Sequence, residues 1–226
     1  MPDFFNNYDN LLEQITDKHQ IHNLIYIRWK LNFDYWERFA HLSFFEKLFN
    51  EHKYHFLYEI QGLSSQIHFG IINCFLFRDM ISMVTGRPNQ YNHRYTFMIE
   101  ATIHEIYSYW NRVGLAINTY LKTPNNIKRT YFSQVISQLE KDYPDLANDK
   151  NYQWLYNVKK SVEDLQRNEF AHNNSLIMQN FLPKEEGGGN FKELLAMPEI
   201  LQANNIMIVD QIGNLVELLE TLEKLK

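Results

Sequence analysis

The sequence predicts an all-α protein, an up-and-down helical bundle of about four core helices with accessory N-terminal helices. Apolar residues recur at alternating spacings of three and four through most of the chain, which is the period of helices that face a core. The periodic segments are long, the breaks between them are short, and no stretch shows the convincing alternation of a half-buried strand. The 226 residues include 8 glycines and 6 prolines, few for the many turns of a β-sandwich.

The expected helices follow one another with clear stop signals. Leu11, Leu12 and Ile15 predict a short first helix, and residues 23–50 predict one or two more. A long helix over residues 54–84 is expected to end at Thr85-Gly86-Arg87-Pro88, a combination that breaks helices. The remaining helices are expected at residues 94–121, 127–142, 152–172 and 206–225.

The length and composition favour one domain, residues 1–226. The chain is 45% hydrophobic and 15% aromatic, which suffices for a packed core and is too apolar for disorder. We expect aromatic-rich N-terminal helices over residues 1–50 and the bundle core over residues 54–226. The aromatic residues of the first region occupy more than one helix face, so either the rest of the fold or a partner covers them.

Glycines and prolines mark special positions in this pattern. Gly62, Gly70 and Gly114 lie in expected helices, where they predict close approach of a neighbouring helix. Residues 182–198 contain three consecutive glycines and two prolines, which predict a mobile connection. These glycines follow no strand and precede no Lys-Ser/Thr pair, which excludes a phosphate-binding P-loop.

Charge and targeting signals limit the partners. The net charge of −5 argues against a broad electrostatic grip on nucleic acid, so we expect no DNA binding and only local RNA contacts. The N-terminus lacks the basic and apolar regions of a secretory signal, and no apolar run reaches the roughly 20 residues of a membrane span. We therefore expect a soluble cytoplasmic protein. Cys74, in an apolar run, is expected to be a buried, inert thiol.

No metal or cofactor is expected. The histidines of the first 70 residues lack acidic or cysteine companions at ligand spacing, and the pair His19 and His22 is too small a set for a site. His104-Glu105 begins like a zinc-protease motif, but Ser108 stands where the second histidine is needed.

Glu105, Tyr109 and Arg112 recur at spacings of four and three, so their side chains can share one side of a helix. One interpretation is a surface ion pair bridged by the tyrosine. The other is a polar strip that supports a site around Arg167 and His172 on an adjacent helix.

The helix expected over residues 152–172 ends in an unusual way. Its apolar stripe, continued at the same spacing, arrives at Glu169 and His172, where a bundle helix would place two more apolar residues. Burying a carboxylate or an imidazole without a partner costs roughly several kcal/mol. This end of the helix is therefore either frayed into solvent or the rim of a cleft or interface. The stripe consists of Leu155, Val158, Val162 and Leu165.

The sequence Arg167-Asn168-x-x-x-His172 resembles the R-x(4–6)-H signature of HEPN domains, in which a polar residue, often asparagine, commonly follows the arginine. HEPN proteins are helical bundles, usually dimeric, and many are metal-independent ribonucleases whose site combines the arginine and histidine of two protomers. The resemblance implies Arg167, Asn168 and His172 as catalytic residues, with Glu169 beside them. It also implies a homodimer that acts on RNA, a toxin or defence role, and an antitoxin protein as a partner.

Helix geometry constrains how this motif works. At about 100° per residue, Arg167 and His172 point about 140° apart, so one straight helix does not aim both at one phosphate. Either the helix loosens after Phe170, or a two-fold dimer brings the groups of two chains together. The resemblance implies the dimer.

Three functions remain open from the sequence. The first is a metal-independent ribonuclease that leaves 2′,3′-cyclic phosphate ends. The second is a non-catalytic HEPN-like module that binds a nucleotide, RNA or a protein. The third is a helical scaffold in which Arg167 forms a surface ion pair and His172 caps the helix.

Overall fold

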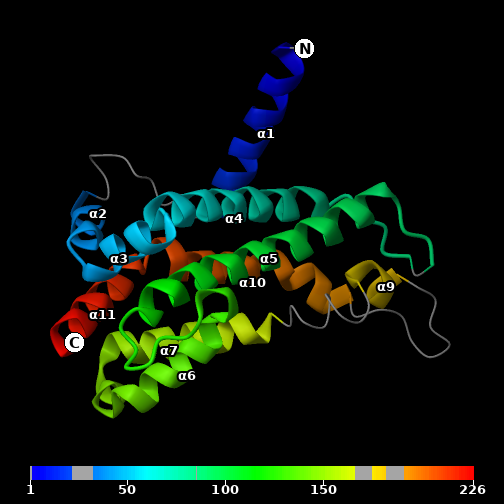
Figure 1. Ribbon diagram of the computed structural model, residues 1–226. Coiled ribbons are helices and arrows are strands. Elements are labelled where there is room, and N and C mark those ends of the chain that lie inside the picture. Colours follow the sequence, from blue (N-terminus) through cyan, green and yellow to red (C-terminus); the bar gives the residue numbers. More distant parts are fainter. Residues whose placement is uncertain (1, 22–32, 85, 166–174, 182–190) are drawn as a thin grey trace. The chain divides into compact units, whose positions relative to one another are not determined.

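The computed structural model describes residues 2–21, 33–84, 86–165, 175–181 and 191–226. These residues form α-helices and two short 3-10 helices, and they contain no strand (Figure 1). The protein is therefore an all-α helical bundle, as the period of its apolar residues predicts.

The elements follow in the order α1 (Pro2–His19), α2 (Phe33–Ala40), α3 (Ser43–His52), α4 (Phe56–Arg78), α5 (Gln90–Asn118), η1 (Ile127–Arg129), α6 (Phe132–Asp142), η2 (Pro144–Asn148), α7 (Lys150–Asp164), α9 (Leu176–Phe181), α10 (Phe191–Val209) and α11 (Ile212–Leu225).

The chain forms two compact units, each built from three stretches of sequence. The first unit comprises Met1–Asn23, Gln66–Glu105 and Leu165–Asn205. The second comprises Leu24–Ser65, Ile106–Asp164 and Ile206–Lys226.

In the second unit, α7 packs against α6 and α11, and α11 also packs against α2. One face of α11 is buried through Leu215, Leu219 and Leu222, in keeping with its amphipathic sequence. The side chains of Glu217, Glu220 and Glu223 follow one another at spacings of three along the same helix.

The three carboxylates of α11 hold residues that are distant in sequence. Glu217 accepts a hydrogen bond from Asn151 at 3.1 Å. Glu220 receives both Nε and Nη2 of Arg38 at 2.7 Å, the bidentate geometry that suits a guanidinium and a carboxylate. Glu223 accepts from the hydroxyls of Tyr120 at 2.7 Å and Ser43 at 2.8 Å. The polar side of α11 therefore joins this helix to α2, α3 and α7 and to Tyr120, just after the end of α5.

Two of the three predicted close glycine contacts are present. A Cβ at Gly70 would overlap the hydroxyl of Thr102 on α5, and a Cβ at Gly114 would lie 3.1 Å from Cα of Phe132 on α6. Asn111 strengthens the second contact, because its side-chain oxygen accepts the N–H of Phe132 at 3.0 Å. The prediction for Gly62 is wrong for the described part of the chain, where a Cβ at this position would meet no atom within 4 Å.

The prediction of a mobile connection over residues 182–198 is wrong for its second half. Residues 182–190 lie outside the described part of the chain, but α10 begins at Phe191 and includes Pro198. Proline cannot donate to the carbonyl four residues earlier and normally breaks a helix. Here the carbonyl in question, that of Leu194, accepts the Tyr95 hydroxyl at 2.7 Å. The neighbouring Leu195 carbonyl accepts from Arg78 at 3.2 Å.

Other boundaries also differ from the expectation. The helix predicted over residues 54–84 ends at Arg78, before the stop signal at Thr85-Gly86-Arg87-Pro88. The helix predicted to begin near residue 94 begins at Gln90, because the Asn89 side chain caps it by accepting the N–H groups of Tyr91 and Asn92. The helix predicted over residues 206–225 is divided, since α10 ends at Val209 and α11 begins at Ile212.

Candidate functional site

The four motif residues predicted to form the site, Arg167, Asn168, Glu169 and His172, lie outside the described residues. The helix before them behaves as the sequence predicts. Leu155, Val158 and Val162 of α7 are buried, and Leu165, directly after the helix, is buried as well. The apolar stripe that leads to the motif is thus confirmed, and the roles of the motif residues stay predictions.

On the other side of the motif, Glu100 of α5 fixes the start of α9. Its Oε1 accepts the backbone N–H of Leu176 at 2.7 Å. A carboxylate at a helix N-terminus satisfies a free donor and interacts well with the helix dipole. Leu176 itself is buried. Within the first unit, the chain that follows the motif is therefore anchored to α5.

Tyr109 and Arg112, two of the supporting residues expected from the sequence, have different environments. Tyr109 is fully buried with its ring edge-on to Trp110, and burial raises the pKa of its hydroxyl. This hydroxyl has no hydrogen-bond partner among the described residues. Tyr109 is thus a core residue of the second unit, and its supporting role for the motif stays a prediction.

Arg112 turns to α4. Its Nε lies 3.6 Å from Oε2 of Glu59, and its guanidinium carbon lies 5.9 Å from the ring centroid of Tyr54. Among the described residues Arg112 therefore pairs with Glu59 and not with Glu105, the partner that one of the two interpretations gave it. Glu105 is half-buried and is the last residue of the stretch Gln66–Glu105 of the first unit. Its supporting role for the motif stays a prediction.

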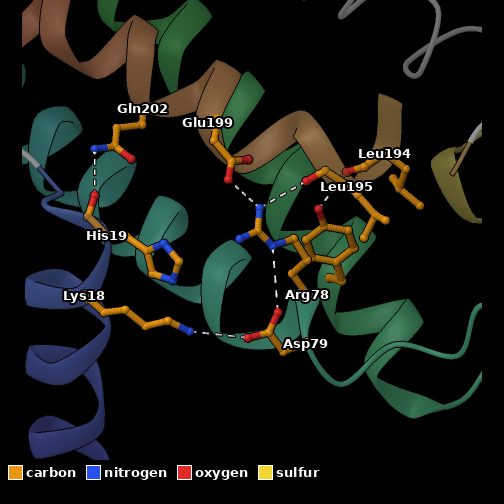
Figure 2. Close-up of polar contacts among 9 residues, drawn as sticks. Lys18, His19, Arg78, Asp79, Leu194, Leu195, Glu199 and Gln202 are labelled. Carbon is orange, nitrogen blue, oxygen red and sulfur yellow. Dashed lines mark hydrogen bonds and ion pairs between the residues drawn. The ribbon is translucent and has the colours of Figure 1, made fainter. Parts of the chain in front are cut away.

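A polar cluster that the sequence did not predict lies in the first unit, around Arg78 at the end of α4. Nη1 of Arg78 is 2.6 Å from Oε1 of Glu199, and Nε is 4.0 Å from Oδ1 of Asp79. Asp79 also pairs with Lys18 of α1 at 3.7 Å. Figure 2 shows the Arg78 side chain aimed at α10, where it reaches both the Glu199 carboxylate and the Leu195 carbonyl.

His19 completes this cluster from α1. Its ring stacks on Phe75 with centroids 4.1 Å apart, and its Nε2 is buried without a partner among the described residues. Burial, together with the charges of Lys18 and Arg78, lowers the pKa of His19. Gln202 of α10 donates to the backbone carbonyls of His19 and Gln20, the first of which Figure 2 shows. These carbonyls end α1 and need such partners.

The chemistry of the Arg78 cluster is that of a structural joint. Its guanidinium is occupied by one carbonyl and two carboxylates, and the neutral imidazole of His19 packs against a phenyl ring. The contacts of Arg78 and Gln202 tie α10 to α4 and α1. A proline inside an apolar helical pattern signals that some donor must replace the missing one, but the sequence does not identify Tyr95 or Arg78 as neighbours.

Comparison of the chain with protein-family models, curated proteins and solved structures gave no match. The likeness to HEPN domains therefore rests on Arg167-Asn168-x-x-x-His172 and on the helical architecture. Over the described residues, no helix has both the length and the apolar character that a bilayer crossing needs. The same residues hold no group of three or more histidine, cysteine or acidic side chains arranged for a metal ion.

Proposed function

We propose that the protein is a metal-independent endoribonuclease of the HEPN type, with a toxin or defence role. Its composite site would lie at a homodimer interface. The observation that carries the proposal is the sequence Arg167-Asn168-x-x-x-His172, placed directly after the buried stripe of α7. The all-α architecture supports it, because HEPN domains are helical bundles.

The proposed reaction needs only side chains. The ribose 2′-oxygen attacks the adjacent phosphorus while a neutral His172 accepts the hydroxyl proton. As the new O2′–P bond forms, the P–O5′ bond breaks, and a protonated imidazole gives its proton to the leaving 5′-oxygen. Arg167 holds two phosphate oxygens and stabilises the charge that develops on them. The products carry a 2′,3′-cyclic phosphate and a 5′-hydroxyl.

A dimer supplies the two imidazoles that this chemistry requires. Because Arg167 and His172 point about 140° apart on a straight helix, one chain does not easily place both on one phosphate. Near a two-fold axis a residue meets its own counterpart, so a motif placed at the axis would gather two guanidinium and two imidazole groups in one groove. On a continuous helix, Asn168, four residues before His172, would share its face and would orient the imidazole or bind a phosphate oxygen.

The test is incubation of the purified protein with total RNA in excess EDTA, followed by analysis of the fragment ends. We expect cleavage with 2′,3′-cyclic phosphate ends that is lost in His172→Ala and in Arg167→Ala. The matched controls are His93→Ala and Arg129→Ala, exposed residues outside the motif, which should cut like the unmodified protein. A well-folded dimer that leaves every RNA intact would refute the proposal.

A second candidate is a non-catalytic HEPN-like module that binds a nucleotide, RNA or a protein such as an antitoxin. The net charge of −5 favours it, since a general ribonuclease gains from a basic surface. Under this alternative, the two motif substitutions change binding or dimerisation, which sedimentation would detect, and no nuclease activity accompanies any form of the protein.

A further inference from the structure

The turn between α3 and α4 brings aromatic residues together on the surface of the second unit. α3 ends at His52, and Lys53 adopts the left-handed conformation with φ of 52°, donating its N–H to the Phe49 carbonyl. This conformation ends the helix and reverses the chain. Residues 53–55 then connect to α4, which starts at Phe56. The reversal places His55 against the side chains of α3.

The His55 ring contacts the rings of Phe45, Phe49 and Tyr58, and we call these four residues the His55 cluster. The His55 ring centroid lies 6.1 Å from Phe45, 6.2 Å from Phe49 and 6.2 Å from Tyr58, each in an edge-to-face arrangement. The Nδ1 of His55 accepts the backbone N–H of Tyr58 at 3.3 Å, which helps to orient the imidazole. These edge-to-face contacts with His55 hold the rings of Phe45, Phe49 and Tyr58 in place.

The outer rings of this cluster are unusually exposed. Tyr58 has 73% and Phe49 has 50% of its surface open to solvent. Isolated exposed aromatic residues are common, but these two belong to one contact network. Exposed rings held by their neighbours offer flat surfaces on which a base can stack with little loss of conformational entropy.

A cavity of about 420 Å³ also has α3 as a wall, although none of the four rings of the cluster lines it. His52, one helical turn after Phe49, lines this cavity together with Lys47 of the same helix. The opposite wall includes Asn118, at the end of α5, and Lys128, in η1. Both walls belong to the second unit.

Positive charge predominates in this cavity. Neither Lys47 nor Lys128 forms an ion pair with a described residue, while Glu51, the acidic lining residue, lies 3.5 Å from Nε2 of His52. Two lysines in a recess can hold phosphate oxygens, for which ammonium groups are good point-charge partners.

We propose that the His55 cluster and this cavity together bind single-stranded nucleic acid. A backbone phosphate occupies the cavity against Lys47 and Lys128, and a base farther along the same strand stacks on Tyr58 or Phe49. Two lysines without an ion-pair partner among the described residues, on the same unit as exposed rings, favour this ligand over an apolar protein surface, which would leave the lysines without partners. The site is local, in keeping with the acidic net charge, and it does not depend on the ribonuclease proposal.

The test is fluorescence anisotropy with labelled 12-nucleotide uridine and adenosine strands made of 2′-O-methyl RNA, and with DNA strands of corresponding length. The 2′-O-methyl strands lack the attacking hydroxyl, so they stay intact whether or not the protein is a ribonuclease. Binding of the 2′-O-methyl strands, the DNA strands or both supports the proposal, and their comparison shows which sugar is preferred.

Each part of the site has its own expected effect. Tyr58→Ala and Phe49→Ala should each weaken binding roughly tenfold through lost stacking, whereas Tyr58→Phe should retain affinity because it keeps the ring. Lys47→Gln and Lys128→Gln should each lower the slope of log affinity against log salt by about 0.7, the value for one phosphate contact with a single strand. All five side-chain changes are on residues that are at least partly exposed, so we expect folded variants, checked by circular dichroism.

The matched controls lie elsewhere on the protein. Phe97→Ala removes an aromatic ring that is 63% exposed in the first unit, and Lys141→Gln removes an exposed lysine from α6. Both should bind like the unmodified protein. The proposal is overturned if no strand binds below about 100 µM, the weak limit of non-specific association. It is also overturned if the Tyr58 and Phe49 variants bind no more weakly than the controls.

Discussion

The hydroxyl of Tyr95 donates a 2.7 Å hydrogen bond to the carbonyl of Leu194, the acceptor that Pro198 leaves without its helical donor. The side chains of Tyr95 and Leu194 are both buried, so water does not readily replace this hydrogen bond. The relationship explains how α10 continues through a proline. Because the replacement donor is a side chain of α5, the continuity of one helix depends on its packing against another within the first unit.

We expect Tyr95→Phe to lower the free energy of unfolding by about 1–3 kcal/mol, since the buried Leu194 carbonyl loses the donor that replaces the missing N–H of Pro198. The ring and its packing are retained, so little else changes. The measurement is urea unfolding of the variant beside the unmodified protein.

A double-mutant cycle isolates this bond. Pro198→Ala restores a backbone N–H that can donate to the Leu194 carbonyl. In the Pro198→Ala background, Tyr95→Phe should therefore destabilise the protein much less. Equal losses in both backgrounds would show that the hydroxyl acts through some other contact.

Gly70 and Gly62 of α4 form a second matched pair. Gly70→Ala should destabilise the protein by about 1–3 kcal/mol, because its methyl group would overlap the Thr102 hydroxyl. Gly62→Ala should stabilise it by roughly 0.5–1 kcal/mol, because alanine is the better helix former and the space around this position is open. Thermal melts of both variants give the signs, and opposite signs are the expected outcome.

The pair of Arg38 and Glu220 predicts a specific response to acid. Hydrogen bonds from Arg38 lower the pKa of Glu220 from its ordinary value near 4.5, against the smaller opposite effect of burial. A carboxyl group with a lowered pKa stabilises the folded state fully above its unfolded pKa and loses this contribution as the pH falls through the folded pKa. The contribution should therefore be complete at neutral pH and decline below about pH 4.5.

Urea unfolding at several pH values tests this expectation. Glu220→Gln should be less stable than the unmodified protein at neutral pH, and the difference should shrink as the pH falls below about 4.5. Arg38→Gln should show the same trend, because it removes the other half of the pair. A stability difference that does not vary with pH would contradict the assignment.

Cys74 should be chemically inert in the folded protein. Its side chain is fully buried, and burial raises the pKa of the thiol, so the reactive thiolate is scarce. A disulfide reagent at about pH 8 should label it only at the rate at which the protein opens, and quickly in urea. Rapid labelling of the folded protein would show that this part of α4 opens locally.

The sequence predicted the helical class and most of the elements because both follow from local periodicity. The stripe of α7 is an example, since Leu155, Val158 and Val162 are buried as expected. The close contacts at Gly70 and Gly114 were also predicted, because glycine in a helix interior is costly without a packing reason. Gly62 shows the limit of that argument, since the sequence does not reveal which helix face meets a neighbour.

The errors have a common physical cause, which is that the deciding partner is distant in sequence. Pro198 predicts a helix break because the compensating donor, the Tyr95 hydroxyl, lies 99 residues before Leu194, whose carbonyl accepts it. In the same way, one interpretation of the spacing pairs Arg112 with Glu105 of its own helix, whereas its carboxylate partner among the described residues is Glu59 of α4. Local spacing cannot select among charged residues that only the tertiary fold brings near.

The carboxylates of α11 also bear on how the chain is made. Arg38 cannot pair with Glu220 until that residue, 182 positions later, has been synthesised, and the same holds for Ser43 and Glu223. While the ribosome is still producing the intervening helices, the early part of the second unit lacks these partners and the apolar face of α11 that accompanies them. Assembly of this unit therefore follows the synthesis of α11.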